Sequence, residues 1–181
     1  IIFTNNDSAY KAAIEFNKNN IKALILDTRE NSDGDLVKEA QSLGLDIKFN
    51  SGVADVKGRL KISSATIGKL NSDKDSFSDL EDIECDCICM SGGWTPTVHL
   101  SSQAGNKLKF DEDLDAFVPN NKKQKETAIG SANGSFTLKQ SLAEGFQVGF
   151  DLSNSITSNN KNTTVPTSKE SSYQAHDKFW C

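Results

Sequence analysis

Several kinds of feature are missing from this chain of 181 residues. No apolar run approaches the roughly 20 residues that a membrane-spanning helix needs, so we expect no membrane partner. No cluster of Lys and Arg is interleaved with aromatic residues, and the net charge is −5, so we expect no nucleic-acid partner. The composition, 36% hydrophobic, is sufficient for a buried core in one domain or slightly more.

Motifs for nucleophilic catalysis and for metal binding are also missing. Neither His99 nor His176 is accompanied by a G-x-S-x-G motif, so both are predicted to be surface or turn residues. Residues 111–113 form an acidic turn, but nothing else supplies the further oxygen ligands that a hard cation needs. The sequence therefore predicts no catalytic residue and no metal site.

The cysteine pattern lacks the C-x-x-C spacing of many redox and metal sites. Three of the four cysteines, Cys85, Cys87 and Cys89, form C-x-C-x-C. We expect residues 83–90 to be a buried strand, in which a period of two puts these thiols on one face. Thiols so close along one strand are poorly placed to form a disulfide. The pattern favours buried thiols in a reducing, cytoplasmic compartment, with a metal or redox site as the alternative.

The first 27 residues predict a β-α-β unit. Apolar runs at 1–3 and 21–26 flank a polar turn at 4–8 and a helix at 9–16, whose inner face would carry Ala9, Ala12, Ala13 and Phe16. Buried, non-alternating strands joined by a helix are typical of a parallel α/β sheet. Asp27 follows the loop by about 20 residues, the spacing of the acid that meets the ribose in dinucleotide-binding units.

This first loop lacks the glycines of the G-x-G-x-x-G fingerprint. It carries Asn5, Asn6 and Asp7, and asparagine tolerates the left-handed angles that the turn needs. The side chains would nevertheless occupy the phosphate position, and Asp7 would repel a phosphate. Two interpretations stay open: a degenerate nucleotide loop with Asn5, Asn6 and Asp27 as weaker cofactor ligands, or a helix capped by Asn6 or Asp7.

The following segments predict the rest of an α/β unit and a small antiparallel meander. The expected elements are a helix at 34–43 ended by Gly44, a strand at 46–49, meander strands at 51–57 and 60–70, and a charged loop or hairpin tip at 71–81.

A second loop before a helix does contain glycine. We expect a strand at 127–129, a loop at 130–135, and a helix at 138–152 whose start is a capping box of Thr137 and Gln140. A helix N-terminus after a glycine-bearing loop is a natural site for an anion or a nucleotide. The residues alone are compatible with a structural turn or with a ligand loop.

The order of these segments resembles the second half of the disulfide reductase fold, which has two dinucleotide domains. Residues 91–96, Ser-Gly-Gly-Trp-Thr-Pro, occupy the place of its A-T-G-x-x-P turn, and residues 127–145 the place of its A-x-G-D…E-G flavin segment. The resemblance implies an α/β, Rossmann-like, FAD/NAD(P)-binding fold of three layers with a small meander, present as a fragment.

The sequence is more closely similar to the alpha subunit of heterotetrameric sarcosine oxidase. The similar motifs are 3–10, 91–100, 110–119 and 130–145. The resemblance implies an oxidoreductase that converts sarcosine to glycine, with formation of hydrogen peroxide and 5,10-methylenetetrahydrofolate. It also implies beta, gamma and delta subunits as partners, tetrahydrofolate as a substrate, and FAD and FMN mainly outside this fragment.

The same resemblance implies that this fragment supplies an NAD-binding fold and is inactive alone. The flavin segment of the disulfide reductase fold normally has Gly-Asp, whose carboxylate bonds the ribityl–pyrophosphate part of FAD, but this chain has Gly130 and Ser131. The loss of Asp argues against firmly held FAD and is compatible with NAD. We therefore expect NAD to contact Gly130, Ser131, Phe136 and Leu138, with Thr137 capping the helix beside it.

The alternatives to this assignment are another FAD/NAD(P)H-dependent reductase and a non-catalytic dinucleotide-fold scaffold. The expected organisation is an inner NAD-type domain over 1–100, a return segment of the outer domain over 101–152, and a linker with the start of a further unit over 153–181. Because the chain has no initiator Met, we expect it to be an internal fragment of a longer protein.

Overall fold

The computed structural model describes residues 1–120, 123–156 and 164–169. They fall into two compact units, one ending at Gly93 and the other beginning at Trp94. The further unit expected at 173–181 lies outside the described residues.

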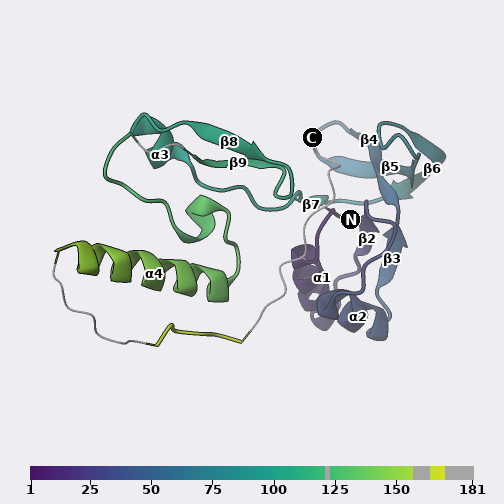
Figure 1. Ribbon diagram of the computed structural model, residues 1–181. Helices are drawn as coiled ribbons and strands as arrows, with labels where there is room; N and C mark the ends of the chain where they lie inside the picture. The colour runs from purple at the N-terminus through teal and green to yellow at the C-terminus, as the bar shows by residue number, and fades with distance from the viewer. Residues whose placement is uncertain (121–122, 157–163, 170–181) are drawn as a thin grey trace. The chain divides into compact units, whose positions relative to one another are not determined.

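The first unit is built around a four-stranded parallel sheet (Figure 1). Its strands, in the spatial order β3-β2-β1-β7, are β1 (Ile2–Thr4), β2 (Leu24–Asp27), β3 (Asp46–Phe49) and β7 (Cys89–Ser91). Thr4 lies opposite both Asp27 and Ser91 in the register. The polar residues that end three neighbouring strands therefore meet at one edge of the sheet.

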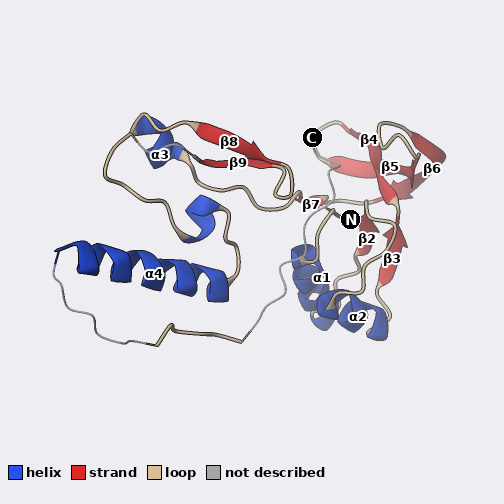
Figure 2. Ribbon diagram, viewed as in Figure 1, coloured by secondary structure: helices blue, strands red, loops and turns tan. Residues whose placement is uncertain are grey.

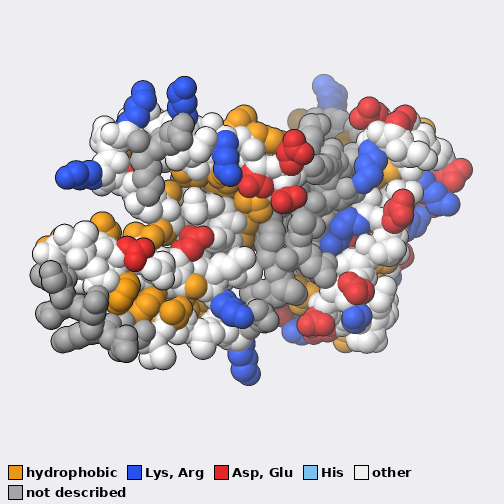
Figure 3. Space-filling view, viewed as in Figure 1, with side chains coloured by type: hydrophobic (Ala, Val, Ile, Leu, Met, Phe, Trp, Pro, Cys, Tyr) orange, Lys and Arg blue, Asp and Glu red, His pale blue; other side chains and the backbone are white. Residues whose placement is uncertain are grey.

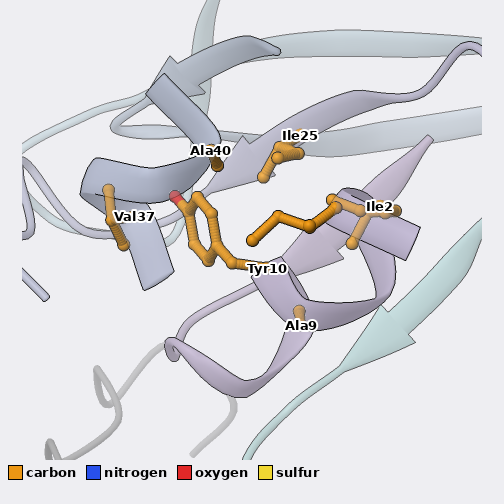
Figure 4. Packing of buried hydrophobic residues seen from close by; sticks show 8 residues of the cluster. Ile2, Ala9, Tyr10, Ile25, Val37 and Ala40 are labelled. Carbon is orange, nitrogen blue, oxygen red and sulfur yellow. The ribbon is translucent and has the colours of Figure 1, made fainter. Parts of the chain in front are cut away.

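Two helices, α1 (Ser8–Lys18) and α2 (Asp35–Ser42), cover one face of this sheet. Figure 4 shows Tyr10 reaching from α1 towards Val37 and Ala40 of α2, with Ile2 and Ile25 from the strands beside it. Burying one such large side chain contributes about 1.5–3 kcal/mol. The core beneath the helices is thus small but continuous.

The buried face of α1 differs from the expected one. Ala9 and Ala13 are buried as expected, with Tyr10 and Ile14 beside them, but Ala12 is exposed. The buried face is centred on Tyr10, whose hydroxyl donates to the buried carboxylate at the end of β2, and Ala12 lies outside that face.

A three-stranded antiparallel meander covers the other face. Its strands are β4 (Ser51–Gly58), β5 (Ile62–Leu70) and β6 (Phe77–Glu84), in that order. Phe3 and Leu26 of the parallel sheet pack there against Ala65 and Ile67 of β5. Helices, parallel sheet and meander form the three layers, which confirms the fold class implied by the resemblance (Figure 2).

Of two expectations in this region, one holds in part and one is wrong. The charged loop or hairpin tip expected at 71–81 is a hairpin tip only as far as Ser76, because β6 begins at Phe77 and pairs with β5. Residues 83–90 are not one strand, because β6 ends at Glu84 and β7 begins at Cys89. The acidic residues of β6 misled the prediction. They lie on an exposed strand and pair with lysines of other strands, as Glu81 does with Lys48 of β3 at 2.8 Å.

The second unit begins with a short helix and a hairpin. Its elements are α3 (His99–Gln103), β8 (Leu108–Asp111), β9 (Ala116–Pro119), the 3-10 helix η1 (Gly130–Asn133) and α4 (Leu138–Ile156). Phe110 and Phe117 pack edge to face across the hairpin with their ring centroids 5.3 Å apart. The expected strand at 127–129 is wrong: Ile129 is extended, but the described residues place no strand beside it.

Within the described chain, α4 buries none of its side chains. Leu138, Leu152 and Ile156 are 61%, 56% and 81% exposed, and Figure 3 shows hydrophobic side chains gathered over this helix. Among the described helices, none combines the length and the apolar character needed to cross a membrane.

Candidate functional site

The first candidate site is the loop between β1 and α1, at the carboxyl edge of the parallel sheet. Its Asn6 side chain accepts a hydrogen bond from the Ser8 backbone N–H at 3.0 Å and donates one to the Ser91 carbonyl, also at 3.0 Å. Asn5 donates to the Gly92 carbonyl at 3.3 Å. The loop is thereby tied to the end of β7, and the Asn6 carboxamide meets the helix N-terminus where a phosphate would sit.

The acid at the end of β2 is also occupied by the chain itself. Asp27 is fully buried, and Arg29 binds it through two hydrogen bonds of 2.9 and 2.7 Å. The same guanidinium contacts Asp7 at 2.7 Å. Burial alone would lower the pKa of Arg29, but the hydrogen bonds and charge of Asp27, then those of Asp7, raise it above its ordinary value. The arginine therefore stays charged between two carboxylates.

Tyr10 completes this cluster from α1. Its hydroxyl donates to Asp27 at 2.7 Å. Burial, and next the negative charge and hydrogen bond of Asp27, raise the pKa of Tyr10 well above its ordinary value of about 10. The phenol therefore stays protonated and serves as a donor to Asp27.

The first site is therefore filled by its own side chains. A ribose would have to displace Arg29 from Asp27, and a pyrophosphate would meet the carboxylate of Asp7 near the loop. Of the two open interpretations, the geometry favours the capped helix: Asn6 accepts from the first helical N–H, whereas Asp7 binds Arg29 and makes no capping bond.

The second candidate site is the loop at η1. Gly130 adopts a left-handed φ of 62°, which favours glycine, and its N–H donates to Glu144 of α4 at 2.7 Å. The Ser135 hydroxyl donates to the other oxygen of the same carboxylate. The loop thus already presents two donors to an anionic group, and in this chain that group is Glu144.

The start of α4 follows the expected capping box. The Gln140 N–H donates to the Thr137 hydroxyl oxygen at 3.2 Å, and the Thr137 N–H donates to the Gln140 side chain at 3.4 Å. The reciprocal pair satisfies two backbone donors of the first turn. Thr137 therefore caps the helix, as predicted.

A cavity of about 310 Å³ lies beside this loop within the second unit. Two carboxylates and several amide and hydroxyl groups line it together with apolar side chains: Ser101, Asn106, Glu126, Ile129, Asn133, Glu144 and Val148. The buried Ser101 and Asn106 both donate to Glu126, the former at 3.1 Å. Such a wall suits hydroxyl groups or a positively charged ring better than a phosphate, because carboxylates accept hydrogen bonds and repel anions.

The structure places the four residues expected to contact NAD, and the capping Thr137, along one stretch next to this cavity. Gly130 and Ser131 open η1, Phe136 is half-buried, and Leu138 is mostly exposed at the start of α4. None of the five is among the described residues of the cavity wall.

The cavity wall contains residues that the sequence did not single out. Glu126 and Asn106 come from segments without a motif, so no signal pointed to them. Glu144 and Gly145 match the E-G pair that ends the flavin segment of the disulfide reductase fold. That match could have identified Glu144 from the sequence.

The cysteines do not share one face. Cys85 packs with the meander-side core, Cys89 packs with the helix-side core, and Cys87 is exposed. The expectation of three buried thiols on one strand is therefore wrong, because the chain leaves β6 before Cys85 and turns before β7. The described residues contain no cluster of three or more His, Cys, Asp or Glu that could hold a metal ion.

Solved structures define the fold class of the chain. A thioredoxin reductase of T. acidophilum superposes with a TM-score of 0.64, covering 86% of this chain and 52% of that one at 17% identity. The bacillithiol disulfide reductase of Staphylococcus aureus superposes with a TM-score of 0.58 over 85% of this chain and 50% of that one, at 15% identity. The fold is thus that of the FAD/NAD(P)-binding disulfide reductases.

Two curated proteins are similar to this chain in sequence, and both are alpha subunits of sarcosine oxidase. Sarcosine oxidase subunit alpha of Corynebacterium sp. (strain P-1) is 27% identical over 151 residues, 82% of this chain and 15% of that protein. The same subunit from strain U-96 is 26% identical over 80% of this chain. The chain spans about 15% of the length of these relatives. No protein-family model matches it. These relatives confirm the resemblance to sarcosine oxidase subunit alpha, and the solved structures confirm the resemblance to the disulfide reductase fold.

Proposed function

We propose that this chain is part of the alpha subunit of an oxidoreductase that demethylates sarcosine to glycine. In this proposal oxygen is the acceptor, hydrogen peroxide is formed, and the one-carbon unit leaves as 5,10-methylenetetrahydrofolate. The observation that carries the proposal is the likeness to sarcosine oxidase subunit alpha over 82% of the chain. The disulfide reductase fold supports it, because that fold binds dinucleotides.

The contribution of this segment is a dinucleotide-binding fold, and we assign NAD to the second unit. The cavity beside η1 is large enough for part of a dinucleotide, since ligand pockets commonly measure about 300–1,000 Å³. The carboxylates of Glu126 and Glu144 suit ribose hydroxyls and the positively charged nicotinamide ring. We therefore assign the nicotinamide–ribose end to the cavity and the remaining NAD contacts to Gly130, Ser131, Phe136 and Leu138, beside the cap at Thr137.

The first unit has a structural role in this proposal. Its inner loop does not fit a nucleotide, because Asn6 already binds Ser91 and Asp27 already binds Arg29. The proposed partners are beta, gamma and delta subunits, with FAD and FMN held mainly outside this segment. We place the assembly in the cytoplasm, and the free thiols of Cys85, Cys87 and Cys89 support that placement.

The test is the identity of the nucleotide that the native assembly releases. The full-length protein, purified with its partner subunits, is denatured, and the released nucleotides are identified by mass spectrometry. We expect NAD in stoichiometric amount besides the flavins. Ser131→Asp should lower the NAD content roughly tenfold, because it adds a carboxylate at the loop. Ser155→Asp, near the exposed end of α4, should leave the NAD content unchanged.

Other outcomes would contradict the proposal in distinguishable ways. Loss of FAD in place of NAD from the Ser131→Asp variant would favour another flavin-dependent reductase. If the Ser131→Asp substitution changes the content of no released nucleotide, the result would favour a non-catalytic scaffold. The filled inner loop already supports that alternative. If the Asp27→Asn substitution lowers the NAD content, the NAD site would have to be assigned to the first unit instead of the second.

A further inference from the structure

Cys87 and Cys89 lie together at the edge of the parallel sheet in the first unit. Their Sγ atoms are 3.9 Å apart. Cys87 is exposed, and Cys89, the first residue of the terminal strand β7, is half-buried. Two thiols at this separation, one of them open to solvent, are a chemical group that the proposed dinucleotide fold does not use.

We propose that Cys87 and Cys89 form a reversible, redox-active dithiol that closes to an intramolecular disulfide on reaction with a low-molecular-weight disulfide. This inference does not rest on the proposed function.

The chain geometry permits the bond. The obstacle expected for thiols along one strand does not apply, because Cys87 precedes β7, which begins at Cys89, and the two Sγ atoms lie only 3.9 Å apart. The two sulfurs already face one another, so side-chain rotation brings them into bonding distance. Because Cys87 is exposed, the disulfide should be readily reduced again.

The surroundings assign different roles to the two thiols. Reactivity requires a thiolate that an oxidant can reach, and Cys87 is the exposed member. Burial first, and then the neighbouring Cys87 sulfur, raise the pKa of Cys89. Cys89 is therefore protonated at neutral pH and suited to be the second, resolving thiol.

The reaction balances as a thiol–disulfide exchange in two steps. The Cys87 thiolate attacks one sulfur of the small disulfide, which forms a mixed disulfide and releases one small thiolate. Cys89 then loses its proton and attacks the Cys87 sulfur, which forms the protein disulfide and releases the second small thiolate. The two protons lost by the cysteines are taken up by the two small thiolates. The protein is oxidised by two electrons, and the small disulfide is reduced to two thiols.

The backbone around the pair is anchored to the first strand. The Cys89 N–H donates to the Ile1 carbonyl, and the Ile1 nitrogen donates to the Cys87 carbonyl, both at 2.9 Å. The two cysteines are therefore held on the same short segment of the sheet edge, and closure of the ring needs no movement of a distant element.

The test uses the reduced full-length protein and glutathione disulfide as the oxidant. After incubation the reaction is quenched with acid, free thiols are alkylated, and the peptides are mapped by mass spectrometry. We expect the peptide with Cys87 and Cys89 to be lighter by two hydrogen atoms and unalkylated, and dithiothreitol to restore both thiols. A lasting glutathione adduct on Cys87 with Cys89 free, or no reaction at either residue, would overturn the proposal.

Three matched variants separate the roles. Cys85→Ser should retain the internal disulfide, because Cys85 packs on the other side of the sheet. Cys89→Ser should trap the glutathione adduct on Cys87. Cys87→Ser should slow the reaction of the thiol that remains, Cys89, roughly tenfold or more, because Cys89 is less exposed and burial raises its pKa. An internal disulfide in the Cys87→Ser or Cys89→Ser variant would show that another pairing forms. Peptide mapping of the unmodified protein decides the question even if a variant fails to fold.

Discussion

The buried cluster of Tyr10, Asp27, Arg29 and Asp7 determines what the first unit can bind. Its position was partly predictable, because the spacing of Asp27 from the loop follows from the length of one helix and one strand. Its pairing was not predictable. The sequence motif assigns that acid to a ribose, and nothing in the pattern indicates that an arginine two residues later turns back onto it. Such a contact depends on side-chain directions that only the folded structure supplies.

Tyr10 leads to a prediction about alkaline pH. Its pKa is raised in the folded chain, so above its ordinary value of about 10 the unfolded chain loses the phenolic proton first. The free energy of unfolding should therefore be fully retained below pH ~10 and fall as pH rises further, by at most about 1.4 kcal/mol per pH unit. Urea unfolding of the chain and of its Tyr10→Phe variant between pH 8 and 11 measures this.

The Tyr10→Phe variant is its own control, because the other tyrosine and all lysines are unchanged in it. At pH 8 the variant should be less stable by about 1.5–3 kcal/mol, the contribution of a hydrogen bond to a charged group. The difference between the two proteins should shrink above pH ~10. Parallel stability curves across the range would contradict the prediction.

At the scale of elements, the strands and helices that sequence predicts well are those with one dominant buried face. The β-α-β-α-β order was predictable, because its strands are short apolar runs and α2 ends before Gly44 as expected. β6 was missed because its charges pair with lysines on a solvent-exposed sheet. The expected strand at 127–129 was wrong because strand pairing needs a neighbour that local sequence does not reveal.

The capping box of α4 gives a prediction for one helix. Thr137→Ala removes the acceptor for the Gln140 N–H, and loss of such a cap costs about 1 kcal/mol. Because 1 kcal/mol is about a factor of five in an equilibrium constant, amides 140–142 should exchange with solvent about fivefold faster. Thr137→Ser should keep the slow exchange, and Ser155→Ala at the far end should not affect the first turn. Equal exchange in the Ala and Ser variants would exclude a capping role.

At the scale of the whole molecule, the two units differ in how much core they contain. The first unit has buried clusters on both faces of its parallel sheet. In the described residues of the second unit, α4 contributes no fully buried side chain and leaves Leu138, Leu152 and Ile156 exposed. Hydrophobic burial is the main favourable term in folding, so the two units should differ in their ability to fold as separate fragments.

This difference predicts the behaviour of two fragments. Residues 1–93 should fold alone, with dispersed amide resonances and a single cooperative urea transition. Residues 94–156 should show neither, because a helix without a buried face lacks the packing that stabilises helices in proteins. A cooperative transition in the second fragment, or none in the first, would contradict this reading. Both fragments can be compared under the same buffer and temperature.

Arg29, which lies between Asp27 and Asp7, also affects how the stability of the first unit depends on the nucleotide concentration in the cell. A domain that gains stability by binding a nucleotide becomes less stable when the concentration of that nucleotide falls, by an amount set by mass action. Here the guanidinium of Arg29 neutralises Asp27, the acid that would otherwise bind the ribose of a nucleotide. We therefore expect the folded fraction of the first unit to be independent of the nucleotide concentration in the cell.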